Sequence, residues 1–146
     1  MSAEPVVRVK LLRPGAQVPR RASEGASGYD ICAALNGGSV VVGQQPTLVP
    51  TGIALEVPPG FDAQLRPRSG LARQGILATF GTLDSDYRGE LMITLYAMGP
   101  GISHTVHDGD RIAQLVLARL VFPAFVEATE LTATARGAGG HGSTGR

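Results

Sequence analysis

Residues 53–66 read Ile53-Ala54-Leu55-Glu56-Val57-Pro58-Pro59-Gly60-Phe61-Asp62-Ala63-Gln64-Leu65-Arg66. Apolar and polar residues alternate on both sides of the Pro-Pro-Gly sequence. Because successive side chains of a β-strand point to opposite faces, this period of two predicts two half-buried strands, Ile53–Val57 and Phe61–Arg66. Further strands are predicted in Val7–Leu11, Ser39–Val42, Thr47–Val49, Glu90–Met98 and Arg111–Leu120.

Glycine and proline limit the amount of helix in this chain. Twenty glycines and ten prolines leave almost no window in which an apolar helical period can run for three turns. Many short strands separated by turns are typical of an all-β sandwich or barrel. The exception is Ser69–Gly75, where Ser69 can N-cap a helix and Gly75 can end it. We expect an all-β fold with one short helix.

Length and charge exclude several classes of protein. A chain of 146 residues fits one domain with a real core. Thirteen basic and twelve acidic residues give a charge of +1, too balanced for a protein that binds long nucleic acid. The single Cys32 cannot form an internal disulfide, and Met1–Pro5 has no signal-peptide features. No apolar run could span a bilayer. We expect a soluble, cytoplasmic protein that binds neither nucleic acid nor membranes.

The segment Gly81–Glu90 reads GTLDSDYRGE and has the highest density of chemical groups in the chain. Between two glycines it holds two carboxylates, Asp84 and Asp86, together with the phenol of Tyr87 and a guanidinium. A turn this rich in charge between apolar runs is costly to fold for structure alone. It predicts a catalytic segment with an aspartate as general base. The alternative is that both aspartates are ordinary turn residues, because aspartate is favoured in turns.

The C-terminal segment Arg136–Arg146 has a different composition from the rest. Five of its eleven residues are glycine, so it has no fixed shape by itself. Two arginines, His141 and the hydroxyls of Ser143 and Thr144 could contact a polyanion as the backbone wraps around it. The alternative is a frayed terminus without a role.

Five segments together resemble the trimeric deoxyuridine triphosphatases (dUTPases), in the order found in that family. They are Ala26–Ile31 (ASGYDI), Pro67–Ala72 (PRSGLA), Gly81–Glu90, Gly109–Leu115 (GDRIAQL) and Arg136–Gly145. The resemblance implies a jelly-roll domain over residues 1–135, and a flexible tail over 136–146 that closes over the active site. It also implies a homotrimer with shared active sites. The reaction would be Mg²⁺-dependent hydrolysis of dUTP to dUMP and pyrophosphate, which removes dUTP and supplies dUMP for thymidylate synthesis.

The resemblance also assigns roles to individual residues. The catalytic base would be Asp84, with Asp86 as the neighbouring alternative. Asp30 would act on Mg²⁺ through a bound water, while the substrate phosphates hold the cation, since Mg²⁺ keeps several waters and rarely needs a protein cage. The residues assigned to the phosphate chain are Arg68, Ser69 and Gly70, with Gln114 at the α-phosphate and Arg136, Gly142, Ser143 and Thr144 in the closing tail.

Substrate selectivity is assigned to a predicted hairpin over residues 76–87. The Tyr87 ring packed on the deoxyribose would leave no space for a 2′-hydroxyl. Main-chain groups would match uracil and reject the thymine methyl and the cytosine amine. Positions lining this pocket are Ala78, Gly81, Thr82, Leu83 and Met92. The sequence departs from the common family pattern at Ala78 (usually Asn), Phe80 (usually Pro) and His141 (usually Phe), where a neutral imidazole could still stack on uracil.

Two other functions are compatible with this fold. The first is a dCTP deaminase or a bifunctional relative, which would release ammonia from dCTP. The second is a nucleotide-binding regulator that has lost hydrolysis and would release no pyrophosphate from dUTP. The complete set of Asp84, Gln114 and the tail favours the hydrolase. No motif includes His104 or His107, which we expect to be exposed, and we expect Cys32 to be a small core residue.

Overall fold

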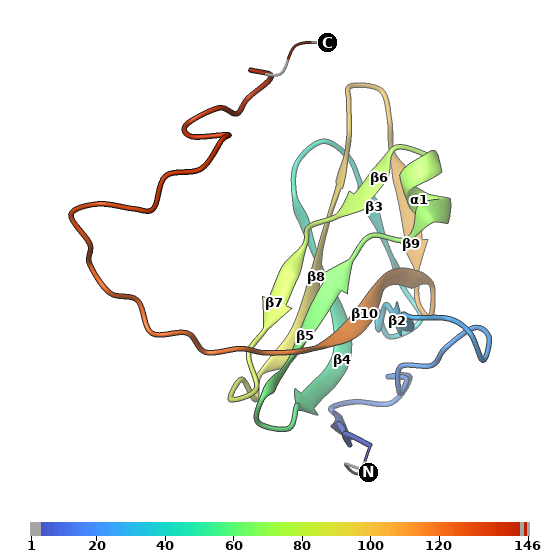
Figure 1. The fold of residues 1–146 in the computed structure, drawn as a ribbon. Coiled ribbons are helices and arrows are strands. Elements are labelled where there is room, and N and C mark those ends of the chain that lie inside the picture. The colour runs from blue at the N-terminus through green and yellow to red at the C-terminus, as the bar shows by residue number, and fades with distance from the viewer. Residues whose placement is uncertain (1–3, 144, 146) are drawn as a thin grey trace.

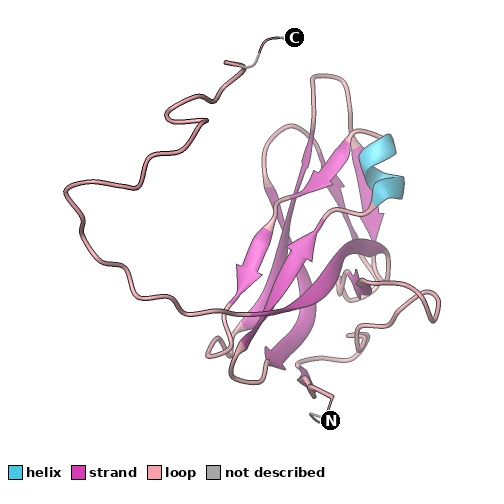
Figure 2. Cartoon of the chain, in the orientation of Figure 1, coloured by secondary structure: helices cyan, strands magenta, loops and turns pink. Residues whose placement is uncertain are grey.

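The computed structural model describes residues 4–143 and 145 and is built mainly from β-strands (Figures 1 and 2). It has ten strands and one short helix. In chain order the elements are β1 (Arg8–Leu11), β2 (Tyr29–Cys32), β3 (Ser39–Val42), β4 (Thr47–Glu56), β5 (Phe61–Arg66), α1 (Ser69–Arg73), β6 (Ile76–Ala78), β7 (Gly81–Leu83), β8 (Glu90–Ala97), β9 (His104–His107) and β10 (Arg111–Arg119). The expected all-β class is confirmed.

The strands form two four-stranded sheets and one two-stranded sheet. Their orders are β1-β4-β8-β6, β2-β10-β5-β7 and β3-β9, and the paired strands run antiparallel. Side chains from all three sheets enter one core. In β8, for example, Leu91, Ile93 and Leu95 are buried while the residues between them are partly exposed. Each such side chain contributes roughly 1.5–3 kcal/mol by leaving water.

Two predicted strands have the observed bounds, and one prediction of separate strands is wrong. Ser39–Val42 and Phe61–Arg66 match β3 and β5. The predicted strands Thr47–Val49 and Ile53–Val57 merge into the single strand β4, which ends at Glu56. It continues through Pro50 because an irregularity shifts its register with β8 between Pro50 and Ala54. Proline is tolerated at such an irregularity because its missing N–H need not enter the ladder there.

The predicted hairpin over residues 76–87 is also wrong. β6 pairs with β8 in one sheet, whereas β7 pairs with β5 in the other. Thr79 and Phe80 therefore carry the chain from one sheet to the other. Two short strands separated by two residues indicate a hairpin by spacing alone, but here each finds a longer partner elsewhere.

After β10 ends at Arg119, residues 120–143 form an arm without helix or strand, which extends away from the body (Figure 1). Its apolar side chains are exposed, with Phe122 at 80%, Phe125 at 95% and Leu131 at 90%. The glycine-rich segment from residue 136 is the distal part of this longer arm. Within the described residues, no helix is long and apolar enough to cross a membrane.

Candidate active site

One recess, of about 340 Å³, lies where β2, β10 and the start of α1 meet. The strand registers place Asp30 beside Gln114 and Gln114 beside Arg66. The recess thereby brings together predicted residues from three separate sequence motifs. Those that line it are Asp30, Arg68, Ser69, Gly70 and Gln114.

Asp30 is held by two arginines. Its carboxylate accepts hydrogen bonds from Arg68 Nε (3.0 Å) and from Arg111 Nη1 (3.5 Å). Arg68 also donates from Nη1 to the backbone oxygen of Arg111 at 3.2 Å. Two guanidinium groups around one carboxylate leave a net positive charge, which favours an anionic ligand. Arg111 was not among the predicted site residues, although it is the only basic residue of the GDRIAQL motif.

The carboxamide of Gln114 is positioned from two sides. Its Nε2 donates to the Pro67 carbonyl at 2.9 Å. A Cβ at Gly28 would lie 2.1 Å from Gln114 Oε1, so only glycine allows this close approach. The glycine of the ASGYDI segment thus shapes the recess through its missing side chain.

Helix α1 begins differently from the prediction. Arg68 is the N-cap residue, with extended backbone and no side-chain capping hydrogen bond, and Ser69 is the first helical residue. The prediction that Ser69 caps the helix is therefore wrong. The first N–H groups of any helix have no intrahelical acceptor. Because no side chain caps α1, its first N–H groups are available to a ligand.

A second recess, of about 260 Å³, lies between β7, β8 and the turn that joins them. Four residues predicted around the base and sugar line it together with Asp84. These are Thr82, Leu83, Tyr87 and Met92, and the recess is completed by Leu65, Glu90 and Leu91.

Local hydrogen bonds order the turn that carries Asp84. Tyr87 N donates to the Asp84 carbonyl at 3.1 Å, and the Tyr87 hydroxyl donates to the Glu90 carbonyl at 3.0 Å. A Cβ at Gly89 would lie 2.3 Å from the Tyr87 hydroxyl oxygen, so the ring packs over a residue that must be glycine. Asp84 is exposed, and no hydrogen bond or ion pair within residues 4–143 involves its carboxylate.

Other predicted residues do not line either recess. Ala78 is 3% exposed and lies in the core, so only its main chain is open to a role in base recognition. Gly81 pairs with Leu65 but does not line the second recess. In the tail, Arg136, His141, Gly142 and Ser143 lie in the extended arm, and Arg136 Nε donates to the nearby Gly139 carbonyl at 2.8 Å. Thr144 lies outside the described residues.

Cys32 and the two histidines of β9 line neither of the two recesses. Cys32 is partly exposed on β2, so the prediction of a core residue is wrong. Partial burial, followed by the nearby Asp30 carboxylate, raises the pKa of its thiol and makes it a poor nucleophile. His107 on β9 is exposed, as expected, whereas His104 at the start of the same strand is half-buried, so the expectation of an exposed His104 is wrong. No cluster of three or more His, Cys, Asp or Glu suited to a metal occurs in the described part of the chain.

The model of the dUTPase family matches residues 15–145, which include both recesses and the arm. This chain belongs to the dUTPase family. It is 46% identical over 138 residues to the deoxyuridine 5′-triphosphate nucleotidohydrolase of Chlamydia trachomatis serovar L2, covering 92% of this chain and 94% of that one. The corresponding dUTPase of Methylocella silvestris is 45% identical over 152 residues, covering 99% and 94%.

Solved dUTPase structures share the fold over nearly the whole chain. A point mutant of the Staphylococcus bacteriophage 80alpha dUTPase with dUpNHpp superimposes with a TM-score of 0.87 at 25% identity, covering 97% of this chain and 99% of that one. A point mutant of the dUTPase from phage phi11 of S. aureus, described as coordinating a structural Mg(II) ion, has a TM-score of 0.75 at 24% identity, covering 86% and 97%. The expected family is confirmed.

Proposed function

We propose that this protein is a dUTP diphosphatase, which hydrolyses dUTP to dUMP and pyrophosphate in the cytoplasm. The observation that carries the proposal is a family match over residues 15–145 in which the Asp84 turn and the Asp30 recess are both intact. Curated relatives of 46% identity are named for this activity, and an 80alpha phage relative was solved with dUpNHpp.

Asp84 acts as the general base. Its carboxylate is exposed at the second recess and carries no competing hydrogen bond within residues 4–143, so it is free to accept a proton from water. A base must lie within hydrogen-bond reach of the water it activates, and that water must lie in line with the α-phosphorus. Asp86, the alternative, is also exposed but does not line the recess.

The first recess binds the phosphate chain. Arg68, Ser69 and Gly70 supply positive charge and donors at the start of α1, and Gln114 presents a carboxamide beside them. Because Gln114 Nε2 already donates to Pro67, its position is set before a ligand arrives. Charge neutralisation here stabilises the pyrophosphate that leaves.

The residues around Asp30 fit a magnesium ion held by substrate rather than by protein. A single carboxylate, already paired with Arg68 and Arg111, cannot form an all-protein cage but can accept hydrogen bonds from metal-bound waters. When bound, Mg²⁺ supplies charge neutralisation on the phosphates. Asp30 orients its waters, and Arg68 and Arg111 orient Asp30. The phage phi11 dUTPase, which has the same fold, is described with a structural Mg(II) ion of its own.

The two recesses lie at different ends of β5. Asp84 follows Leu83, which pairs with Ala63 near the start of β5, whereas Arg68 lies beyond the end of β5. Ala63 and Arg68 are five residues apart, which corresponds to roughly 16 Å of backbone at about 3.3 Å per residue. This separation supports a site assembled from recesses of two copies, as in a homotrimer with shared active sites.

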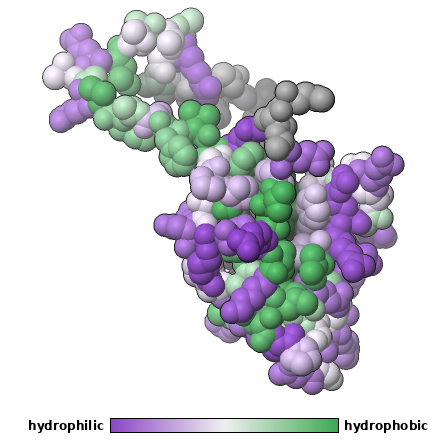
Figure 3. Space-filling model, turned by 90° about the horizontal axis from the view of Figure 1, so that it is seen from below, coloured by the Kyte–Doolittle hydropathy of each residue, from purple (hydrophilic) through white to green (hydrophobic). Residues whose placement is uncertain are grey.

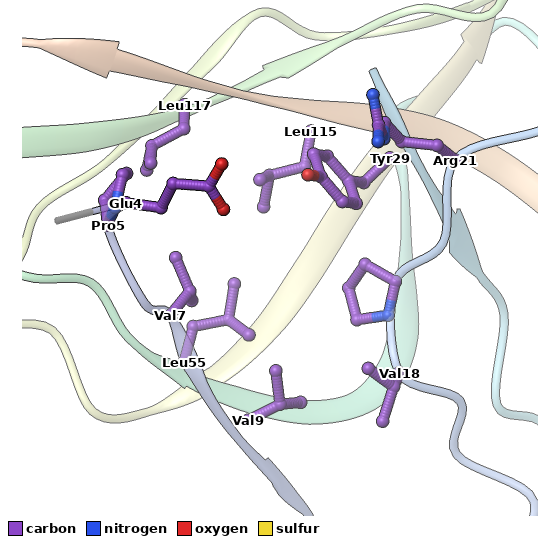
Figure 4. A pocket seen from close by; sticks show the side chains of 11 residues that line it. Glu4, Pro5, Val7, Val9, Val18, Arg21, Tyr29, Leu55, Leu115 and Leu117 are labelled. Atoms are coloured by element: carbon purple, nitrogen blue, oxygen red, sulfur yellow. The ribbon is translucent and has the colours of Figure 1, made fainter. Parts of the chain in front are cut away.

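The arm and an apolar groove support this assembly. An apolar recess of about 580 Å³ lies between β1, β4 and β10 and shares no lining residue with the two recesses described above. Its apolar lining residues are Val7, Val9, Val18, Leu55, Leu115 and Leu117, with Tyr29 at one side (Figure 4). Hydrophobic surface also follows the arm (Figure 3). Phe122 and Phe125 of one copy would gain cover in the groove of another.

Docking of the arm would carry its end to a neighbouring active site. Arg136, His141, Gly142, Ser143 and Thr144 would then close over the nucleotide, with Arg136 and the hydroxyls on the phosphates and His141 on the base. The few local hydrogen bonds of this segment, such as Arg136 to Gly139, leave it free to rearrange when a ligand arrives.

The second recess selects the nucleoside. The Tyr87 ring, 45% exposed, forms a wall against which a deoxyribose can pack, and a 2′-hydroxyl would lose its hydrogen bonds there. Thr82, Leu83 and Met92 complete the pocket. Because the side chain of Ala78 is buried, base recognition depends on the main chain.

The test is to give purified protein dUTP, dTTP, dCTP and UTP in parallel with Mg²⁺, and to measure pyrophosphate and ammonia while light scattering gives the assembly state. We expect pyrophosphate from dUTP alone and the mass of a trimer. Ammonia from dCTP would indicate a deaminase, and binding of dUTP without pyrophosphate would indicate a regulator. Full activity in a monomer would contradict the shared site.

A further inference from the structure

An ion pair behind the second recess joins two segments that are far apart in sequence. Arg13, in the loop after β1, donates from Nη2 to Glu90 Oε1 at the start of β8. The same oxygen accepts the N–H of Gly52 at 2.8 Å. Gly52 lies within the β4 irregularity, where the normal ladder with β8 is interrupted. The Glu90 carboxylate therefore replaces a missing strand contact.

This pair differs from the Arg8–Glu56 pair, which joins strands β1 and β4 of the same sheet. The side chains of Arg13 and Glu90 are 26% and 25% exposed, whereas Arg8 and Glu56 are 77% and 47% exposed with a separation of 3.6 Å. Water and salt screen the Arg8–Glu56 pair strongly and the Arg13–Glu90 pair much less. Arg13 therefore restrains Glu90 more than an ordinary surface partner would.

Glu90 contacts the Tyr87 ring through its main chain. The Tyr87 hydroxyl donates to the Glu90 carbonyl, and the ring packs over Gly89, where no Cβ could fit. Glu90 also lines the recess beside Tyr87. Arg13 and Gly52 thus hold the side chain of Glu90, and the carbonyl of Glu90 in turn holds the Tyr87 hydroxyl.

We propose that Arg13 and Glu90 are positioning residues that hold the Tyr87 ring in place and thereby set the discrimination between deoxyribose and ribose triphosphates. The proposal rests on the function proposed above. Discrimination by a ring depends on its position, because a misplacement of about 1 Å near bound substrate can change rates by about 10²-fold. Losing the pair would relax exclusion of UTP while leaving Asp84 in place.

The test compares kcat/KM for dUTP and UTP in Glu90→Ala, Glu90→Gln, Arg13→Ala and the double alanine variant, with Arg8→Ala as the matched control. We expect Glu90→Ala to lower the dUTP-to-UTP ratio about tenfold, mainly by improving UTP. Glu90→Gln should lower this ratio less than Glu90→Ala does, because the amide oxygen of the glutamine can still accept the Gly52 N–H. The double variant should be no worse than Glu90→Ala alone, since both changes remove one interaction.

A second readout separates this inference from the proposed function. In protein labelled with 3-fluorotyrosine, the ¹⁹F resonance of Tyr87, assigned with Tyr87→Phe, should move in Arg13→Ala and stay in place in Arg8→Ala. If the wild type hydrolyses dUTP but these variants keep both its ratio and its resonance, the positioning role is wrong and the function stands. If the wild type does not hydrolyse dUTP, the function fails, and an unmoved resonance would overturn the positioning role as well. If Glu90→Ala does not fold, the substrate ratios and the Tyr87 resonances of Arg13→Ala and Glu90→Gln test the positioning role instead.

Discussion

The two acidic sites of this molecule, Asp30 and Asp84, have opposite surroundings. Asp30 is 17% exposed and accepts hydrogen bonds from Arg68 and Arg111, whereas Asp84 is exposed and its carboxylate has no partner within residues 4–143. The carboxylate oxygens of Asp30 are thus already engaged and oriented by two guanidinium groups, whereas those of Asp84 are open to a water. We infer from this difference that Asp30 orients charged ligands, whereas Asp84 remains available to take a proton from water.

The largest expected effect comes from replacing the free carboxylate. Asp84→Asn keeps the size of the side chain and removes its basicity, so kcat should fall about 10²- to 10⁴-fold. Stopped-flow or steady-state pyrophosphate release measures this loss. Asp86→Asn is the matched control and should remain within a few-fold of wild type. An undiminished rate in a correctly assembled Asp84→Asn protein would contradict the comparison.

Removing the tail tests whether both acids depend on closure of the site. Deletion of residues 136–146 should leave a folded assembly, because the hydrogen bonds of its described residues, 136–143 and 145, stay within the arm. Turnover should become very weak, since the hydroxyls and Arg136 no longer exclude water from the phosphates. Light scattering and pyrophosphate release are measured on the same sample. Full activity in the truncated protein would show that the tail has no catalytic role.

Asp30→Asn should have a smaller effect than Asp84→Asn and a different character. The amide still fills the space between Arg68 and Arg111 but no longer attracts metal-bound waters, so we expect a rise of about tenfold in the Mg²⁺ concentration required, and a modest loss of kcat. Titration of Mg²⁺ against dUpNHpp binding by calorimetry checks this without turnover. Equal loss of kcat in both variants, at saturating Mg²⁺, would remove the distinction between the two acids.

The smallest effect concerns a third acid, Asp108, which has a purely structural role. Hydrogen bonds from Leu35 N (2.6 Å) and Gly37 N (2.9 Å) lower its pKa below the ordinary 3.8. A lowered pKa in the folded state gives stability that is present above the unfolded pKa and lost as pH falls through the folded pKa. Urea unfolding at equal protein concentration should show Asp108→Asn less stable than wild type at pH 7, with the difference shrinking below about pH 4. A pH-independent difference would contradict this account.

The fold class and many site residues could be predicted because they depend on local patterns. Alternation predicted the bounds of β5 and β-propensity those of β3, and the quoted motifs contain most of the residues that line the two recesses. The partners of β6 and β7 could not be predicted, because strand pairing depends on distant segments. The Arg13–Glu90 pair joins residues 77 positions apart and has no local signature. The length of the exposed arm was also missed, because its apolar residues resemble an ordinary core segment.

Docking of the arm on a second copy, as proposed above, would make this protein's stability depend on its abundance. Side chains that become buried only against another copy contribute to folding through association, so the free energy gained varies with the logarithm of protein concentration. Dilution should therefore lower the midpoint of thermal unfolding. In a newly synthesised chain the apolar side chains of the arm would stay exposed until other copies bind it.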